Sequence, residues 1–276
     1  MKKIFLLLAS LLMSAGFIAC SEDDDAVNPG AVATPKDKVA ETKVTDENGE
    51  EYTLFSTEIT VAGTLETILL ANHQKYEIEA LKVSGRLNGT DMRFIRDLAG
   101  RDTLGHETEG ELRYLDMSGA SIVGGGKTYY RNEYVEQNVI GDFLFEECRK
   151  LETIKLPTSV KGIGYSAFHG CKALRSVELS PQLNYIDMGA FYDCSSLYSI
   201  DLPKSIRYIG NSAFGYTSVT LVYVHWELDE DILSFYYNVF ENTPYYKNLF
   251  VPLGTKDFYT QKYPWKNFSS IIEVEE

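Results

Sequence analysis

The sequence contains few of the residues from which metal sites and disulfide frameworks are built. Its 276 residues include four cysteines and four histidines. No two cysteines have the Cys-x-x-Cys spacing of structural zinc sites, and the histidines are scattered along the chain. We therefore expect neither a metal site nor a cofactor.

Basic residues are scarce relative to acidic ones. Lys and Arg together number 26 against 40 Asp and Glu, which gives a formal net charge of −14. Affinity for the phosphates of nucleic acids comes from clustered Lys and Arg side chains. The composition therefore argues against a nucleic acid as partner.

Complete catalytic motifs are missing as well. Residues 124–128 read Gly-Gly-Gly-Lys-Thr, like the end of a phosphate-binding loop, but Ser121 stands where that motif requires glycine. Residues 164–168 partly resemble a nucleophile elbow, but its second glycine is absent and the segment recurs over residues 210–214. Because repetition favours a structural role, we expect a protein that is not an enzyme.

The one long apolar run lies at the N-terminus. Two lysines precede an apolar stretch over residues 4–13, which is the layout of a secretory signal peptide and is shorter than the about 20 residues that span a bilayer. Residues 16–20 read Gly-Phe-Ile-Ala-Cys and resemble the lipobox of bacterial lipoproteins, whose cysteine is acylated. The resemblance implies a lipoprotein signal peptide over residues 1–19 and lipidation at Cys20, which anchors the chain to a membrane.

Acidic residues follow this cysteine. Residues 21–25 read Ser-Glu-Asp-Asp-Asp and resemble the tag that directs lipoproteins of Bacteroidota to the outer face of the outer membrane, although a solvated tether has the same composition. We expect an outer-membrane, lipid-anchored protein that faces the cell exterior. Residues 20–50 lack apolar periodicity and predict an acidic flexible tether.

A repeat of 23 residues is the strongest signal in the sequence. Apolar residues return at this step in several columns, and a cysteine column accompanies them. The columns are Ile140, Ile163, Ile186 and Ile209; Phe145, Phe168, Phe191 and Phe214; Cys148, Cys171 and Cys194; Leu151, Leu174 and Leu197; Ile154, Val177 and Ile200; Leu156, Leu179 and Leu202; and Val160, Leu183 and Ile206.

Each repeat contains a short alternating segment. Residues 154–156 read Ile-Lys-Leu and recur over residues 177–179 and 200–202, which predicts a strand with two residues buried and one exposed. Equivalent strands of stacked coils lie about 4.8 Å apart. One coil cannot close its own core, so the columns predict a continuous interior shared between neighbours.

The repeat resembles the BspA-like leucine-rich repeats of Bacteroidota surface proteins. Their motif runs Ile-Gly-x-x-Ala-Phe-x-x-Cys-x-x-Leu-x-x-Ile-x-Leu-Pro, and we place it over residues 136–226. The resemblance implies an α/β fold: a right-handed leucine-rich repeat solenoid with a parallel strand ladder, short helices or irregular returns, and N- and C-terminal caps.

The flanking segments are expected to close the solenoid. Residues 51–135 predict an N-terminal cap with wider leucine-rich coils, and residues 227–276 a degenerate repeat with a helical C-terminal cap. Within the first cap we predict one helix over residues 64–70 and a second one, capped by Asp91, that ends near Leu98.

A hairpin is expected just before the first cap. Residues 42–44 and 52–54 are two short runs, and the segment between them contains Asn48 and Gly49, a pair that is typical of a tight hairpin turn.

Cys148, Cys171 and Cys194 are predicted to stand in adjacent coils. Buried thiols that act as small apolar side chains are one interpretation. A disulfide between two of them is the other, because adjacent strands fall within the separation of about 4.4–6.8 Å between bridged Cα atoms and the compartment is oxidising.

The resemblance also predicts the function. Some BspA-like proteins bind host matrix proteins or other cells, which implies an adhesin-like or protein-interaction scaffold with an extracellular protein as partner. Solenoids present the outward side chains of their strand face on a rigid support. The expected binding face consists of Thr153, Lys155, Ser176, Glu178, Tyr198, Ser199 and Asp201, with Lys82 and Asp116 on the upstream coils.

Two other functions stay open. The 19 tyrosines of the chain suit a carbohydrate-binding accessory protein with a glycan as ligand, because flat aromatic faces pack against sugar rings. A spacer that lengthens a larger surface assembly is the third candidate. The tyrosines that would bind a glycan are Tyr165, Tyr185, Tyr192, Tyr208, Tyr236 and Tyr237.

Overall fold

The computed structural model describes residues 39–45, 50–226, 234–236 and 238–275. All the described elements belong to one compact unit, residues 34–276. The predicted signal peptide, Cys20, the first part of the predicted tether and the hairpin turn lie outside the described residues.

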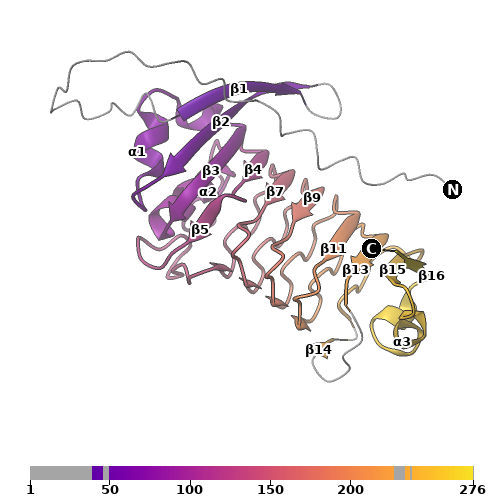
Figure 1. The fold of residues 1–276 in the computed structure, drawn as a ribbon. Helices are drawn as coiled ribbons and strands as arrows, with labels where there is room; N and C mark the ends of the chain where they lie inside the picture. Colours follow the sequence, from indigo (N-terminus) through magenta and orange to yellow (C-terminus); the bar gives the residue numbers. More distant parts are fainter. Residues whose placement is uncertain (1–38, 46–49, 227–233, 237, 276) are drawn as a thin grey trace, which may run out of the picture. The chain divides into compact units, whose positions relative to one another are not determined.

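Parallel strands, one from each coil, form the main ladder of the protein (Figure 1). The first part of the ladder runs β2–β3–β4–β7–β9, and the second part runs β11–β13–β15–β16. The strands are β2 (Glu51–Ile59), β3 (Ala80–Leu87), β4 (Tyr114–Asp116), β7 (Thr153–Lys155), β9 (Ser176–Glu178), β11 (Ser199–Leu202), β13 (Leu221–Val224), β15 (Asn248–Pro252) and β16 (Ser270–Val274). A short strand β5 (Ala120–Ile122) also pairs with β3.

A second parallel ladder was not predicted from the sequence. It runs β14–β12–β10–β8–β6, and each strand is only two residues long. The isoleucine column supplies its buried positions, because Ile140, Ile163, Ile186 and Ile209 pair in register and are fully buried. The strands are β6 (Val139–Ile140), β8 (Gly162–Ile163), β10 (Tyr185–Ile186), β12 (Tyr208–Ile209) and β14 (Ser234–Phe235).

The phenylalanine column forms the centre of the core, as predicted. Phe145, Phe168, Phe191 and Phe214 are each 0% exposed. Successive rings are stacked, with centroids 5.0–5.3 Å apart and interplanar angles of at most 12°. Phe240 adds a further ring at 5.4 Å from Phe214, so the stack continues into the degenerate coil.

The turn around each phenylalanine contains two positions with positive φ. Phe143, Ser166, Gly189 and Ser212 occupy the first position, and Glu147, Gly170, Asp193 and Tyr216 the second. Both sets recur at the same 23-residue step as the buried columns. The backbone conformation of the turn is therefore repeated together with its buried side chains.

The N-terminal cap contains the two predicted helices, α1 (Leu65–Leu70) and α2 (Gly89–Leu98). The predicted cap residue of α2 is wrong by three positions, because Asn88 is the N-cap and accepts a hydrogen bond from the Thr90 amide at 2.9 Å. Asp91 completes the capping box by accepting from the Asn88 amide at 2.9 Å. It also accepts from the Leu65 amide at 3.0 Å, which ties α1 to α2.

Strand β1 (Val39–Thr45) corrects the predicted extent of the tether. It pairs antiparallel with β2 over its whole length, with Thr42 opposite Leu54 and Val44 opposite Tyr52. The prediction of a tether up to residue 50 was therefore wrong at this end, whereas the predicted hairpin strands are confirmed. Most of β1 is exposed, so its sequence is polar and resembles a tether. Backbone hydrogen bonds with β2 nevertheless form it into a strand.

The C-terminal cap combines a helix with a last strand. Helix α3 (Lys256–Gln261) and the 3-10 turn η3 (Trp265–Asn267) lie between β15 and β16. The Trp265 ring lies 5.8 Å from Phe240 and the Phe268 ring 5.3 Å from it, so aromatic side chains cover the end of the phenylalanine stack. A further turn, η2 (Lys75–Glu77), belongs to the N-terminal cap.

Candidate binding surface

Outward side chains of consecutive strands form one row along the main ladder. The register places Lys82 beside Asp116, Asp116 beside Lys155, and Lys155 beside Glu178. Opposite charges alternate along this row, with ion pairs of 3.8 Å between Lys82 and Asp116 and 3.1 Å between Lys155 and Glu178. Because the inward neighbours are buried or, for Val177 and Leu179 beside Glu178, partly buried, these charges point away from the core.

The structure brings most of the predicted face residues together. Thr153, Ser176 and Ser199 are equivalent positions of β7, β9 and β11, one residue before the inward Ile154, Val177 and Ile200. They form a second outward row of small polar side chains beside the charged row. Asp201 takes the place of Lys155 and Glu178 in β11, and its Oδ1 lies 2.7 Å from Nε2 of His225.

A third row of charges runs along the edge where the strands begin. Arg113 is its centre: Nε donates to Oε1 of Glu152 at 2.7 Å, and the guanidinium lies within 4.0 Å of carboxylates of Glu50 and Glu79. The pKa of Arg113 is raised, mainly by this hydrogen bond to Glu152. Tyr198, which is 48% exposed, stands in this row at the start of β11.

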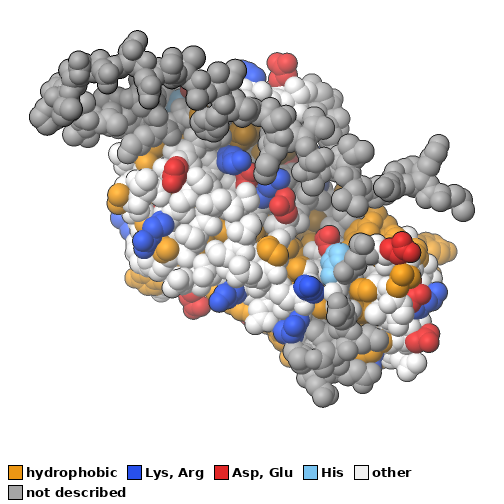
Figure 2. All heavy atoms as spheres, in the orientation of Figure 1, with side chains coloured by type: hydrophobic (Ala, Val, Ile, Leu, Met, Phe, Trp, Pro, Cys, Tyr) orange, Lys and Arg blue, Asp and Glu red, His pale blue; other side chains and the backbone are white. Residues whose placement is uncertain are grey.

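The outward side chains of the main ladder become aromatic and apolar in its C-terminal part. The register continues from Asp201 to Tyr223, Phe250 and Ile272. The rings of Tyr223 and Phe250 are stacked with centroids 4.5 Å apart. Figure 2 shows red and blue side chains over the strands from β3 to β9, and orange side chains gather toward the end formed by β15 and β16.

Sequence reasoning did not include Tyr223, His225 and Phe250 in this face. The alternation in residues 221–224, Leu-Val-Tyr-Val, was a usable signal, because Val222 and Val224 are buried and Tyr223 is outward. The repeat step was not a usable signal, because it changes from 23 residues to 22 between β11 and β13 and to 27 between β13 and β15. We name the outward residues of the main ladder from β3 to β15, together with Tyr198 directly before β11, the strand face.

The tyrosines considered for a glycan do not lie on one surface. Tyr185 and Tyr208 belong to β10 and β12 in the second ladder, whereas Tyr192 lies in the phenylalanine turn, with its ring 5.0 Å from that of Tyr216. The ring of Tyr185 packs against Gly162, where an added Cβ would be 2.1 Å from the ring. Tyr165 contacts Phe143 in the turn, with ring centroids 5.1 Å apart. Tyr237 lies outside the described residues.

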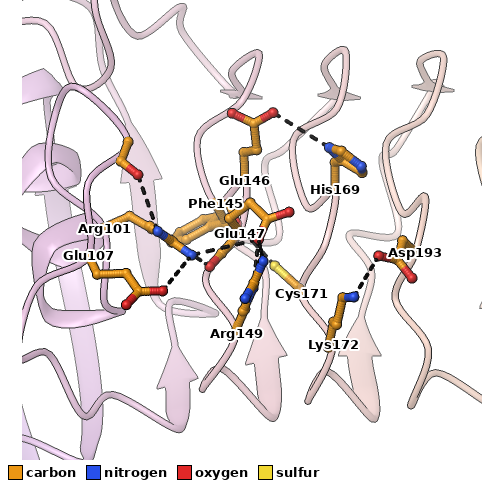
Figure 3. A network of polar contacts seen from close by, with 11 residues as sticks. Arg101, Glu107, Phe145, Glu146, Glu147, Arg149, His169, Cys171, Lys172 and Asp193 are labelled. Carbon is orange, nitrogen blue, oxygen red and sulfur yellow. Dashed lines mark hydrogen bonds and ion pairs between the residues drawn. The ribbon is translucent and has the colours of Figure 1, made fainter.

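Charged residues on the phenylalanine turn bind mainly to one another (Figure 3). Arg101 donates to the Glu147 carbonyl at 2.9 Å and lies 3.6 Å from the Glu147 carboxylate, which links the N-terminal cap to the first 23-residue coil. Lys172 and Asp193 join the next two coils at 3.2 Å. These pairs tie neighbouring coils together along this side.

One of these pairs predicts a pH dependence of stability. Nδ1 of His169 lies 3.5 Å from Oε1 of Glu146, and this contact raises the pKa of His169 and lowers that of Glu146. The stabilisation from His169 is complete below the ordinary histidine pKa and is lost as the pH rises through the raised value. In acid, the stabilisation from the pair is lost as the pH falls through the lowered pKa of Glu146, because the carboxylate becomes protonated.

A His169→Gln variant should therefore be less stable than the wild type by about 1 kcal/mol or less near about pH 6, and the difference should shrink near about pH 9. Urea unfolding at the two pH values measures it. His106→Gln is the control, because the His106 side chain is 71% exposed and its pair with Asp102 is screened by solvent. A destabilisation that is equal at both pH values would contradict this role of His169.

The three cysteines of the repeat are free thiols in the core. Cys148, Cys171 and Cys194 are all buried, and the structure has no disulfide among them. Burial raises the pKa of the Cys148 thiol to about 11 and raises those of the other two. Sγ of Cys171 donates to the Phe145 carbonyl at 3.0 Å, and that of Cys194 to the Phe168 carbonyl at 3.1 Å. The thiols of Cys171 and Cys194 thus bond to backbone carbonyls of the preceding coil.

Neither a metal site nor a membrane-spanning helix is found in the part of the chain that the structure describes. No group of three or more His, Cys, Asp or Glu side chains there is placed to hold a metal ion. None of the described helices combines the length and the apolar character that crossing a membrane requires.

The stacked coils, parallel ladders and shared apolar columns define a leucine-rich repeat solenoid. Residues 135–265 match the BspA type leucine rich repeat region in six copies. The repeats in this part of the chain are thus similar to BspA-type repeats, and the predicted fold class, a leucine-rich repeat solenoid, is confirmed. Among curated proteins, none matches the sequence.

Several solved structures are similar to the chain. A leucine-rich repeat protein of T. pallidum is 26% identical with a TM-score of 0.38, covering 50% of this chain and 64% of that one. A leucine-rich repeat protein of Bacteroides capillosus is 28% identical with a TM-score of 0.34, covering 44% of this chain and 83% of that one. The pneumococcal vaccine antigen PcpA is 12% identical with a TM-score of 0.40, covering 80% of this chain and 56% of that one. This chain matches less than two thirds of the T. pallidum protein.

Proposed function

We propose that the protein is a lipid-anchored, outer-membrane scaffold that faces the cell exterior and binds an extracellular protein through the strand face. The lipobox-like residues 16–20 and the acidic residues 21–25 support the anchor and the exposure. The strand face supports the binding role, because its side chains project from strands that pair in register with neighbouring strands, on both sides in β4 and β7 and on one side in β9 and β11. Host matrix proteins and proteins of other cells are the partners we propose.

The observation that carries this proposal is the change of chemistry along the strand face. Lys82, Asp116, Lys155 and Glu178 form the charged part, and Tyr223 and Phe250 the aromatic part. Tyr198 and Asp201 lie between these two parts. Interfaces between proteins combine an aromatic centre with a charged rim, where the charges favour one partner over others.

A protein partner fits this surface better than a glycan or a simple spacer role. The stacked rings of Tyr223 and Phe250 cover one of each other's faces, which leaves less flat ring surface for a sugar. A spacer needs no aromatic side chains at outward positions, and outward polar residues would serve it better. The surface therefore matches recognition of a protein.

A fourfold alanine variant tests the strand face. Replacing Lys155, Glu178, Tyr198 and Asp201 should weaken binding to an immobilised matrix protein at least tenfold, a loss of about 1.4 kcal/mol, because it removes the boundary between the charged and aromatic parts. The fold should persist, since exposed ion pairs contribute about 0–1 kcal/mol each. Surface plasmon resonance against a panel of matrix proteins measures the change.

The matched control has four alanines beside the second ladder, at Glu136, Lys161, Tyr165 and Asn184, all of which are exposed. This variant should bind like the wild type. If the strand-face variant keeps full affinity, or if the control loses as much, the strand face is not the binding site.

A further inference from the structure

A cavity of about 230 Å³ lies where the degenerate coil meets the C-terminal cap. Two aromatic side chains form apolar walls: Phe240 and Phe268 are each 8% exposed, and their rings meet edge to face at 5.3 Å. The polar lining consists of Asn238, Glu241, Lys247 and Asn267. A few polar groups on apolar walls are the usual composition of a small-molecule site.

Lys247 is an unusual member of this lining because it is only 8% exposed. Its Nζ donates to the Pro244 carbonyl at 2.8 Å and lies 5.8 Å from the Phe268 ring centroid. An ammonium has three N–H donors, and a buried charge is costly unless it is paired. Burial accordingly lowers the pKa of Lys247.

No carboxylate in the described part of the chain forms an ion pair with Lys247. Glu241, on the same cavity, is engaged elsewhere: Oε1 accepts from the Ser212 hydroxyl at 2.7 Å and Oε2 from Nδ2 of Asn238 at 3.5 Å. These bonds leave lone pairs on the Glu241 carboxylate that can accept from hydroxyl groups. The cavity therefore has a cation that lacks an anion beside groups that suit hydroxyls.

The charge of the surrounding segment points to the same kind of ligand. The chain as a whole is acidic, but residues 242–269 contain four lysines and a single acidic residue, Asp257. An anionic ligand at the cavity would thus meet a locally basic segment, which offsets the repulsion from Glu241 and from the acidic remainder of the chain.

We propose that this cavity binds a sugar acid, a pyranose with a carboxylate, either free or at the end of a glycan. The carboxylate pairs with the Lys247 ammonium, and the hydroxyls bind Glu241 and the exposed amide of Asn267. The apolar face of the sugar ring packs against Phe240 and Phe268. This site is separate from the strand face and does not depend on the function proposed for it.

Calorimetric or NMR titration of the purified protein with D-glucuronate and D-galacturonate tests the site. We expect a dissociation constant of about 1 mM or below for at least one of them, and at least tenfold weaker binding of D-glucose, which lacks the carboxylate. L-glutamate should also bind at least tenfold more weakly, because it has a carboxylate but no sugar ring. Equal binding of glucose or glutamate would overturn the proposal.

Lys247→Met is the decisive variant because methionine keeps an apolar stem and removes the charge. It should weaken uronate binding at least tenfold without lowering the melting temperature, since it also removes a desolvated ammonium. Lys266→Met is the matched control: Lys266 is exposed on the same cap, with Nζ 3.5 Å from the Tyr263 ring centroid. Unchanged affinity in Lys247→Met, or an equal loss in Lys266→Met, would show that the cavity is not the site.

Discussion

Replacing Phe168 by alanine should lower the free energy of unfolding by about 3–5 kcal/mol. The side chain is 0% exposed, and its ring stacks on both neighbours, at 5.3 Å from Phe145 and 5.0 Å from Phe191. Alanine would leave a cavity in the middle of the stack and break both ring contacts, each worth about 0.5–1.5 kcal/mol beyond its buried area. The turn that holds Phe168 cannot collapse to fill the space, because coils on both sides fix it.

Urea unfolding followed by circular dichroism measures this loss. Tyr165→Ala is the matched control, because Tyr165 is an aromatic residue of the same turn with a side chain 36% exposed. The control should lose clearly less stability than Phe168→Ala. Equal losses in the two variants would mean that the phenylalanine stack does not hold the coils together.

The core was predictable because its packing repeats. Each phenylalanine position, such as Phe191, meets the same neighbours one coil before and one coil after, so the sequence shows the contact as a column. The second ladder was not predicted, because two-residue strands such as β8 are too short to produce an alternating pattern. Of strand β1 only residues 42–44 were predicted, as one arm of the hairpin, because the strand is mostly exposed and has no apolar pattern that shows its full extent.

The candidate surface was predictable only where the repeat stays regular. Lys155 and Glu178 follow from alternation within a coil of constant length, and the register confirms their positions. Beyond β11 the step changes to 22 and then 27 residues, so Tyr223 and Phe250 could not be placed from the repeat step. Lys247 was not foreseeable at all, because a buried lysine has no sequence pattern that distinguishes it from an exposed one.

The chemistry of outward residues is less constrained than that of inward ones, and this separates fold from function in the protein. Replacing a ring in the stack disturbs two neighbours, whereas Asp201 contacts His225 across one exposed pair. Packing therefore imposes a column inside, whereas the side chains outside are restricted mainly by pairwise contacts such as that between Asp201 and His225. The strand face and the cavity at Lys247 are for this reason the places where the protein can acquire specificity.

Gly85→Ala should lower the free energy of unfolding by about 2–5 kcal/mol. Gly85 lies in β3 between Ile59 of β2 and Ala120 of β5, and its φ is +85°. A side chain in this left-handed region costs about 1–2 kcal/mol. An added Cβ would also lie 2.2 Å from the Ile59 carbonyl oxygen, and forcing packed strands apart costs about 1–3 kcal/mol more.

The matched control for this substitution is Gly124→Ala. Gly124 has no heavy atom within 4 Å of an added Cβ and no positive φ, so its stability should change by about 0.5 kcal/mol at most. Chemical unfolding compares the two variants, and hydrogen exchange locates the damage. Because coils couple mainly to their nearest neighbours, amides of β2, β3 and β5 should lose protection in Gly85→Ala while those of β13 and β15 keep it. If Gly85→Ala proved as stable as Gly124→Ala, β2 and β3 could not approach as closely as the structure places them.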